Sequence, residues 1–162
     1  IRWLIALLSD TGMRLAEAAG LSKEDVFLDT EIPYVRLSER PWRPLKTRSS
    51  ERDVPLVGSA LWAAQRAYPS SPNEYLFPRY CSDEGCKADY ASNSLNKWLR
   101  KHLPNGCVVH SFRHSMRDRL RAVECPAEII DQIGGWTTSG VGQQYGEGFT
   151  LNIIQRFVKQ IE

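Results

Sequence analysis

The stretch His110-Ser111-Phe112-Arg113-His114 is the densest cluster of chemically active side chains in the sequence. It lies at the start of a segment with a helical pattern, so His110 and Arg113, three residues apart, share one face of the predicted helix. A guanidinium beside an imidazole at a helix N-terminus is suited to bind an oxyanion, because the free backbone N–H groups add to the positive potential there. The stretch therefore predicts an oxyanion site at a helix start.

The segments on either side predict a mainly helical α+β fold with a small antiparallel β-sheet. Apolar periodicity and capping residues indicate helices over 1–9, 13–19, 59–68, 95–102, 111–123, 126–133 (with Gly134 after its end) and 151–161. Runs with β-branched residues indicate strands over 34–37 and 52–56, joined as a hairpin with the polar turn 46–50. The proline-rich and polar stretch 69–93 is expected to be mostly loop.

Length and composition restrict the class of protein. The chain has 162 residues, 42% of them hydrophobic and 25% charged, with 5 tryptophans, 6 tyrosines and 5 phenylalanines. This apolar content suits one globular domain and excludes a disordered chain. The longest apolar stretch, near 3–8, is far shorter than the roughly 20 residues that cross a membrane. Four cysteines are too few for a disulfide scaffold, so we expect a reduced, cytoplasmic protein.

Further motifs lie upstream and downstream of the histidine–arginine cluster. Taken singly, each has an ordinary structural explanation: an arginine on a helix is usually solvated, a hairpin lysine is usually a polar turn residue, and a tryptophan usually packs in a core. In chain order the motifs are Thr11-Gly12-Met13-Arg14 with Glu17, Lys46 before Arg52-Asp53-Val54-Pro55-Leu56, the cluster itself, Gly135-Trp136, and Tyr145 nine residues after Trp136.

In this order and spacing the motifs resemble those of the tyrosine recombinases, the phage integrase family. The resemblance runs from about residue 3 to 160 and implies that residues 1–162 are the catalytic domain of such an enzyme. The N-terminal domain with which family members clamp DNA is expected to be missing from this fragment, which begins with Ile1. The implied activity is site-specific DNA recombination through a 3′-phosphotyrosine intermediate, in the integration or excision of a mobile element.

The resemblance implies that Tyr145 is the nucleophile and that Arg14 and Arg113 hold the phosphate. A phenol ionises near pH 10, so it attacks poorly at neutral pH until its proton is accepted. Two permanently charged guanidinium groups suit the non-bridging oxygens and the transition state. Because they supply the positive charge, we expect no metal and no other cofactor.

The remaining motif residues receive proton-transfer and supporting roles. His110 is the candidate general base for the tyrosine, and Lys46 the general acid that protonates the leaving 5′-oxygen. Trp136 either donates its indole N–H to the phosphate or packs beneath it, and it stands where many family members have histidine. His114 is expected to orient its neighbours.

Two basic runs predict the surface that faces DNA. Residues 97–121 hold seven basic and one acidic residue, and residues 36–52 six and two, although the net charge of the whole chain is only +2. Lysines and arginines in such runs exchange condensed counterions for phosphate contacts, whereas a solvated face is the ordinary alternative. The candidate DNA-binding residues are Arg43, Arg48, Lys97, Arg100, Lys101 and Arg117.

Several alternatives stay open on the sequence alone. The chain could be a non-catalytic DNA-binding relative or a strand-passing enzyme like the type IB topoisomerases. Cys81, Cys86, His102 and Cys107 could bind zinc, or Cys81 and Cys86 could form a disulfide, with free thiols as the simpler interpretation. The amphipathic segment 151–161 either folds back on its own domain or packs on a neighbouring protomer. We expect double-stranded DNA attachment sites as partners, a tetramer on DNA and a monomer when free.

Overall fold

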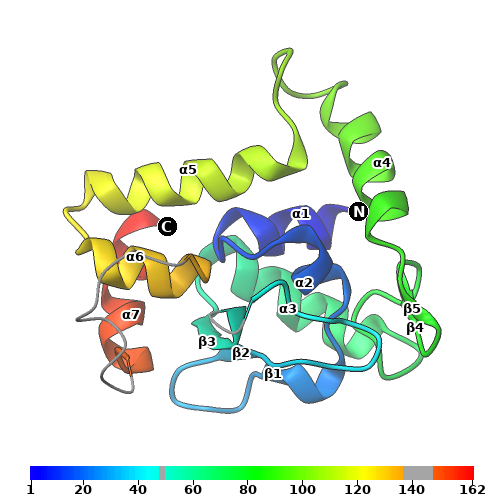
Figure 1. Cartoon of the computed structure of the whole chain (residues 1–162), viewed down its shortest axis with the longest axis horizontal. Coiled ribbons are helices and arrows are strands. Elements are labelled where there is room, and N and C mark those ends of the chain that lie inside the picture. The colour runs from blue at the N-terminus through cyan, green and yellow to red at the C-terminus, as the bar shows by residue number, and fades with distance from the viewer. Residues whose placement is uncertain (48–49, 137–147) are drawn as a thin grey trace.

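A computed structural model describes residues 1–47, 50–136 and 148–162 (Figure 1). The predicted α+β fold, mainly helical with a small antiparallel sheet, is confirmed. None of the described helices is both long and apolar enough to cross a membrane. The elements are α1 (Arg2–Ser9), α2 (Leu15–Ala19), η1 (Lys23–Asp25), β1 (Val26–Phe27), β2 (Tyr34–Leu37), β3 (Arg52–Pro55), α3 (Gly58–Ser70), β4 (Cys81–Ser82), β5 (Gly85–Cys86), α4 (Ala88–Leu99), α5 (Val109–Ala122), α6 (Ala127–Gly134), α7 (Leu151–Val158) and η4 (Lys159–Ile161).

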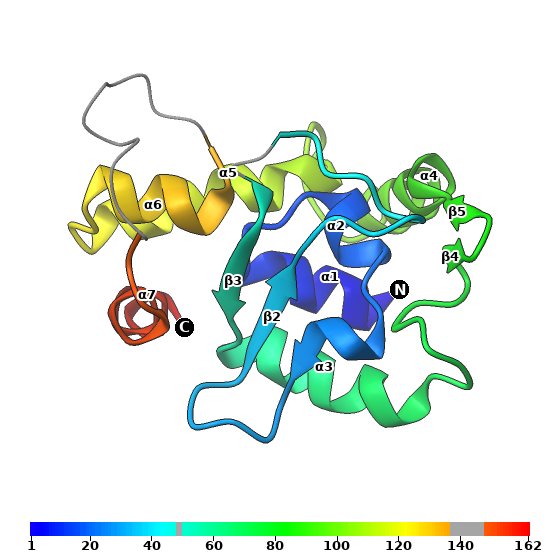
Figure 2. The same cartoon turned by 60° about the horizontal axis from the view of Figure 1, so that its bottom comes forward.

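The predicted hairpin forms, although its connection is longer than the polar turn that we expected. Strands β2 and β3 pair antiparallel from Tyr34 opposite Pro55 to Leu37 opposite Arg52, and β1 adds to the other side of β2. Pro55 therefore ends an edge strand, where its missing N–H costs no ladder bond. Figure 2 shows β3 at the edge of the sheet on the side of α6 and α7.

The stretch 69–93 is more ordered than predicted. It contains the short hairpin β4–β5, and α4 begins at Ala88, seven residues before the predicted start at Leu95. The missed turns of α4 carry Ala91, which is buried one helical turn before Leu95. Because alanine adds little hydrophobicity, the apolar period was too weak in the sequence to extend the helix N-terminally.

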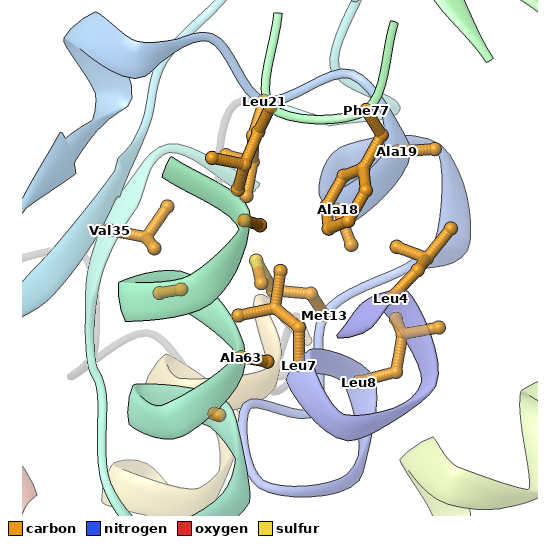
Figure 3. Close-up of a cluster of buried hydrophobic side chains, with 14 of the residues drawn as sticks. Leu4, Leu7, Leu8, Met13, Ala18, Ala19, Leu21, Val35, Ala63 and Phe77 are labelled. Atoms are coloured by element: carbon orange, nitrogen blue, oxygen red, sulfur yellow. The ribbon is translucent and has the colours of Figure 1, made fainter. Parts of the chain in front are cut away.

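The larger hydrophobic cluster joins α1, α2, α3, α4 and the sheet. Figure 3 shows Leu4, Leu7 and Leu8 of α1 gathered with Met13, with Ala63 of α3 and with Ala18 of α2. The face of α3 in this contact consists of alanines, which let the two helices approach closely. Burying each leucine contributes roughly 1.5–3 kcal/mol to folding.

A smaller cluster joins α5, α6 and α7. Met116 and Leu120 of α5 pack with isoleucines of α6 and with Ile154 and Val158 of α7. The amphipathic stripe predicted over 151–161 therefore packs on its own domain in this single chain. Helix α5 runs from α4 to α6 (Figure 1), so its residues near Arg113 lie where the two clusters meet.

A buried ion pair anchors the β2–β3 connection, and it corrects one of the predicted DNA contacts. Arg43 is only 1% exposed and donates to Asp25 at 2.8 Å and to the carbonyls of Gly20 and Ser38. The prediction that Arg43 binds DNA is therefore wrong, because its guanidinium points into the domain toward a carboxylate. Arg40 binds the other oxygen of the same carboxylate at 2.9 Å.

Replacing Asp25 with alanine is expected to lower the free energy of unfolding by about 3–5 kcal/mol, because Arg43 would keep a buried charge without its carboxylate. Urea denaturation measures the change. The matched control is Asp118→Ala, which removes the partner of Arg121 from an exposed ion pair and should cost less than about 1 kcal/mol. Equal losses in the two variants would contradict the importance of the buried pair.

Candidate active site

Three arginine side chains converge on the carboxyl end of α6. Arg52 Nε donates to the carbonyl of Ile133 at 2.7 Å, Arg113 Nη2 to that of Gly134 at 2.5 Å, and Arg14 Nη2 to that of Gly135 at 3.2 Å. Carbonyls at the end of a helix have no partner within the helix and carry the negative end of its dipole. The successive carbonyls 133–135 therefore bind guanidinium groups from the N-cap of α2, from β3 and from α5.

Glu17 contributes a carboxylate, with a formal charge of −1, to this arginine cluster. Its carboxylate accepts from Arg14 Nη1 at 2.7 Å, from the Arg14 backbone N–H at 2.8 Å and from Arg52 Nη2 at 3.0 Å. Burial opposes ionisation of Glu17, but the charge and hydrogen bond of Arg52 and the hydrogen bonds of Arg14 outweigh it and hold the pKa below its ordinary value. Glu17 is therefore ionised at neutral pH and fixes both arginines.

Arg113, the arginine of the histidine–arginine cluster, is almost completely buried. It is 4% exposed, and its Nη1 donates to the carbonyl of Gly12 at 2.5 Å. Burial, followed by the charges of Arg14 and Arg52, lowers its pKa to about 10, so it stays protonated at neutral pH. The two carbonyls in contact with Arg113 use two of the five N–H donors of a guanidinium.

Trp136 packs against two arginines, and the two glycines before it in the sequence make this packing possible. The Cζ atoms of Arg113 and Arg117 lie 4.3 and 4.9 Å from its ring centroid, within cation–π range. Gly134 lies inside α6, not after its end as predicted, and Gly135 takes the left-handed cap with φ +59°. A Cβ on Gly134 would lie 1.9 Å from the Trp136 ring. One glycine thus makes the turn and the other makes room for the ring.

His110 lies in the first turn of α5, on the rim of a cavity of about 330 Å³ that Arg113, Leu8 and Met13 also line. Its ring meets that of His114 edge-on, with 4.8 Å between centroids. Partial burial, and then the neighbouring charges of His114 and Arg113, lower the pKa of His110 below 6.5. The imidazole is therefore neutral at pH 7 and able to accept a proton.

Lys46 is exposed on the β2–β3 connection, and that connection is joined to the arginine cluster by Ser50. Ser50 Oγ accepts a hydrogen bond from Arg14 Nη1 at 2.9 Å. No motif in the sequence indicates that Ser50 takes part in the site. For Arg52 the sequence does carry a signal, because in a strand it shares the inward face with Val54, two residues away.

Most of the remaining predicted residues are exposed or partly exposed at the surface of the domain. Lys97, Arg100 and Lys101 are exposed around the end of α4, where the connection to α5 projects from the domain (Figure 1). Arg117 is partly exposed and lies 3.4 Å from Asp131. Tyr145, the predicted nucleophile, and Arg48, a predicted DNA contact, lie outside the described residues.

The four residues considered for zinc are not brought together. Cys81 and Cys86 face each other across β4 and β5, whereas His102 and Cys107 belong to the connection between α4 and α5. Within the described part of the chain, no group of three or more potential ligands is placed to hold a metal ion. The cysteines are free thiols in this structure, and burial raises the pKa of Cys81 to about 12.

Comparisons with known proteins agree with the predicted family. The model of the phage integrase family matches residues 1–149. A transposase from transposon Tn916 of Enterococcus faecalis is 29% identical over 140 residues, covering 68% of this chain and 33% of that protein. A transposase from transposon Tn1545 of Streptococcus pneumoniae matches to the same extent. The chain thus spans about a third of the length of the curated relatives that it matches.

Solved structures share the fold. The Tn1549 transposon integrase in complex with a circular intermediate DNA has a TM-score of 0.60 at 20% identity, covering 98% of this chain and 57% of that one. The XerA recombinase has a TM-score of 0.58 at 19% identity, covering 96% and 55%. At these identities the likeness supports the fold alone.

Gly134→Ala tests the packing of Trp136. In a helix alanine is more favourable than glycine by about 1 kcal/mol, so any loss of stability must come from the clash with the ring. We expect the variant to lose about 1–3 kcal/mol, measured by urea denaturation. In the double variant Gly134→Ala/Trp136→Ala the same alanine should stabilise relative to Trp136→Ala. A Gly134→Ala protein more stable than the wild type would contradict this packing.

Proposed function

The chain belongs to the phage integrase family, and from this premise we propose that residues 1–162 form the catalytic domain of a tyrosine-type site-specific DNA recombinase. Its reaction would integrate or excise a mobile element. The observation that carries the proposal is the convergence of Arg14 and Arg113 beside Trp136, nine residues before Tyr145 in the sequence. The transposon transposases among its relatives support a mobile element as the substrate.

The phosphate-binding role falls to Arg14 and Arg113. Both guanidinium groups are held by carbonyls of α6, so their positions are set before DNA arrives. Preorganised charge of this kind stabilises a pentavalent phosphorane without reorganisation at the moment of reaction. The side chain of Arg14 is 25% exposed and offers the more open donor of the two.

The cleavage step would proceed by attack of the Tyr145 hydroxyl on the phosphorus. His110, neutral at pH 7, accepts the phenolic proton, and Lys46 protonates the 5′-oxygen as the P–O bond breaks. The products are a 3′-phosphotyrosine and a free 5′-hydroxyl. Attack by another 5′-hydroxyl on the phosphotyrosine reverses the step. Rejoining therefore requires no cofactor, because the phosphotyrosine keeps the energy of the broken bond.

The proposed partner is double-stranded DNA at attachment sites. The exposed Lys97, Arg100 and Lys101 would contact its backbone, and sequence-independent contacts of this kind weaken with salt. Among the proteins with this fold is a transposon integrase solved with DNA, which supports the same partner here. We also propose that the protein forms a tetramer on DNA and is a monomer when free.

A covalent DNA adduct tests the proposal. The protein is incubated with a suicide duplex that spans the joined ends of the mobile element carrying the gene, and adducts are separated on a denaturing gel. We expect an adduct with the wild type and with the exposed-tyrosine control Tyr90→Phe, and none with Tyr145→Phe. Equal adduct with Tyr145→Phe would refute the assigned nucleophile. If the wild type forms no adduct, the result would favour a non-catalytic relative. If the wild type relaxes supercoiled DNA without exchanging strands, the result would favour a topoisomerase.

The rate of adduct formation is expected to fall on acidification, with the acid limb below pH 6.5. The reason is that the neutral form of His110 is the base and its lowered pKa keeps it neutral down to that range. Single-turnover cleavage across pH measures the limb. His110→Gln should form the adduct slowly, and its pH profile should lack the acid limb. In His114→Gln the limb should move toward pH 6.5, because one of the charges that lower the pKa of His110 is gone. An unchanged limb in His110→Gln would assign it to another group.

A further inference from the structure

Ser50 is a polar residue at the centre of several interactions, although it lies between exposed residues of a surface connection. It is 0% exposed, whereas Lys46, Thr47 and Glu51 around it are exposed. A hydroxyl in such a position needs hydrogen-bond partners to offset its loss of water. The identity of these partners connects Ser50 with the proposed reaction.

The hydroxyl of Ser50 joins the phosphate-binding arginine to the lysine-bearing segment. Its oxygen accepts from Arg14 Nη1 at 2.9 Å and lies 3.0 Å from Thr47 Oγ1, with either hydroxyl able to donate. A hydroxyl oxygen can accept one hydrogen bond while its own proton takes part in another, so both contacts are compatible.

The backbone of Ser50 makes two further connections. Its N–H donates to the carbonyl of Thr47 at 3.0 Å, and its carbonyl accepts from Arg52 Nη1 at 2.7 Å. Thr47 directly follows Lys46, so the segment bearing the lysine is held by side chain and backbone together. Ser50 is thus fixed to Arg14 and Arg52 on one side and to the neighbour of Lys46 on the other.

From these contacts we propose that Ser50 is a positioning residue that holds Lys46 in register with the phosphate bound by Arg14. The inference rests on the proposed function. An exposed lysine side chain samples many rotamers, so a general acid on a surface segment must have its backbone fixed relative to the phosphate. Ser50 provides this through a hydrogen bond to the residue that binds the phosphate itself.

A substrate that needs no general acid separates this role from a merely structural one. In a duplex whose scissile 5′-oxygen is replaced by sulfur, the P–S bond breaks and a thiolate leaves without a proton. A thiol ionises near about pH 8.5, so the thiolate is a far better leaving group than an alkoxide. Defects in Lys46 or in its positioning should therefore disappear with sulfur, whereas defects in phosphate binding should remain.

The experiment measures single-turnover cleavage of the oxygen and sulfur forms of the suicide duplex by the intact protein. We expect Ser50→Ala to be about 10- to 100-fold slower on oxygen, the range of one charge-assisted hydrogen bond, and within about threefold of the wild type on sulfur. Lys46→Ala should behave alike, Arg113→Ala should be slow on both forms, and Ser50→Thr should retain the oxygen rate.

Matched variants keep the test decisive. Ser71→Ala removes another buried serine hydroxyl, bonded to the carbonyl of Tyr75, and should change neither rate. If Ser50→Ala fails to fold, Thr47→Val removes the other hydroxyl from an exposed side chain and should show the same pattern, rescued by sulfur.

The remaining outcomes overturn the proposal. A Ser50→Ala defect of equal size on both substrates would mean that the serine acts on Arg14 or on the fold, and wild-type rates on both would mean that it does not act. If sulfur fails to rescue Lys46→Ala while the Tyr145-dependent adduct still forms, the positioning role falls and the proposed function stands. If the wild type forms no adduct on either substrate, both fall.

Discussion

The carboxyl end of α6 is the point at which the site is assembled. Guanidinium groups repel one another at short range, and burial strengthens that repulsion because it removes the screening by water. Arg14, Arg52 and Arg113 can meet there because the last carbonyls of the helix and the ionised Glu17 supply the opposite charge. The same contacts use the free carbonyls that every helix end must satisfy.

This arrangement links the site to the packing of the whole domain. The bond from Arg14 to the carbonyl of Gly135 joins residues 121 apart in the sequence, and the bond from Arg113 to the carbonyl of Gly12 joins residues 101 apart. The arginines therefore reach their positions only when both hydrophobic clusters have formed and α5 connects them. The two guanidinium groups that we propose bind the phosphate are therefore held in place where the two hydrophobic clusters meet, independently of any ligand.

The two basic runs show how far a local count of charge can be trusted. In the run 36–52, Arg36 pairs with Asp53, Arg43 with Asp25, and Arg52 with Glu17, so much of its charge is neutralised within the domain. All three of these carboxylates lie outside the run in the sequence, so a count of charge within the run does not include them. In the run 97–121, Arg117 and Arg119 likewise pair with Asp131 and Asp10. The exposed basic residues around the end of α4 are Lys97, Arg100 and Lys101.

The family, the fold class, the hairpin and most of the helices could be predicted from the sequence. These features depend on local periodicity and on short motifs with fixed spacing, which can be read without knowing where the chain goes. Three features could not be predicted: Arg43 is buried against Asp25, Gly135 and not Gly134 makes the turn after α6, and Ser50 joins Arg14 to the segment of Lys46. Each of these depends on which distant groups meet. A sequence records the donors and acceptors of a buried polar network, but folding selects which of them become partners.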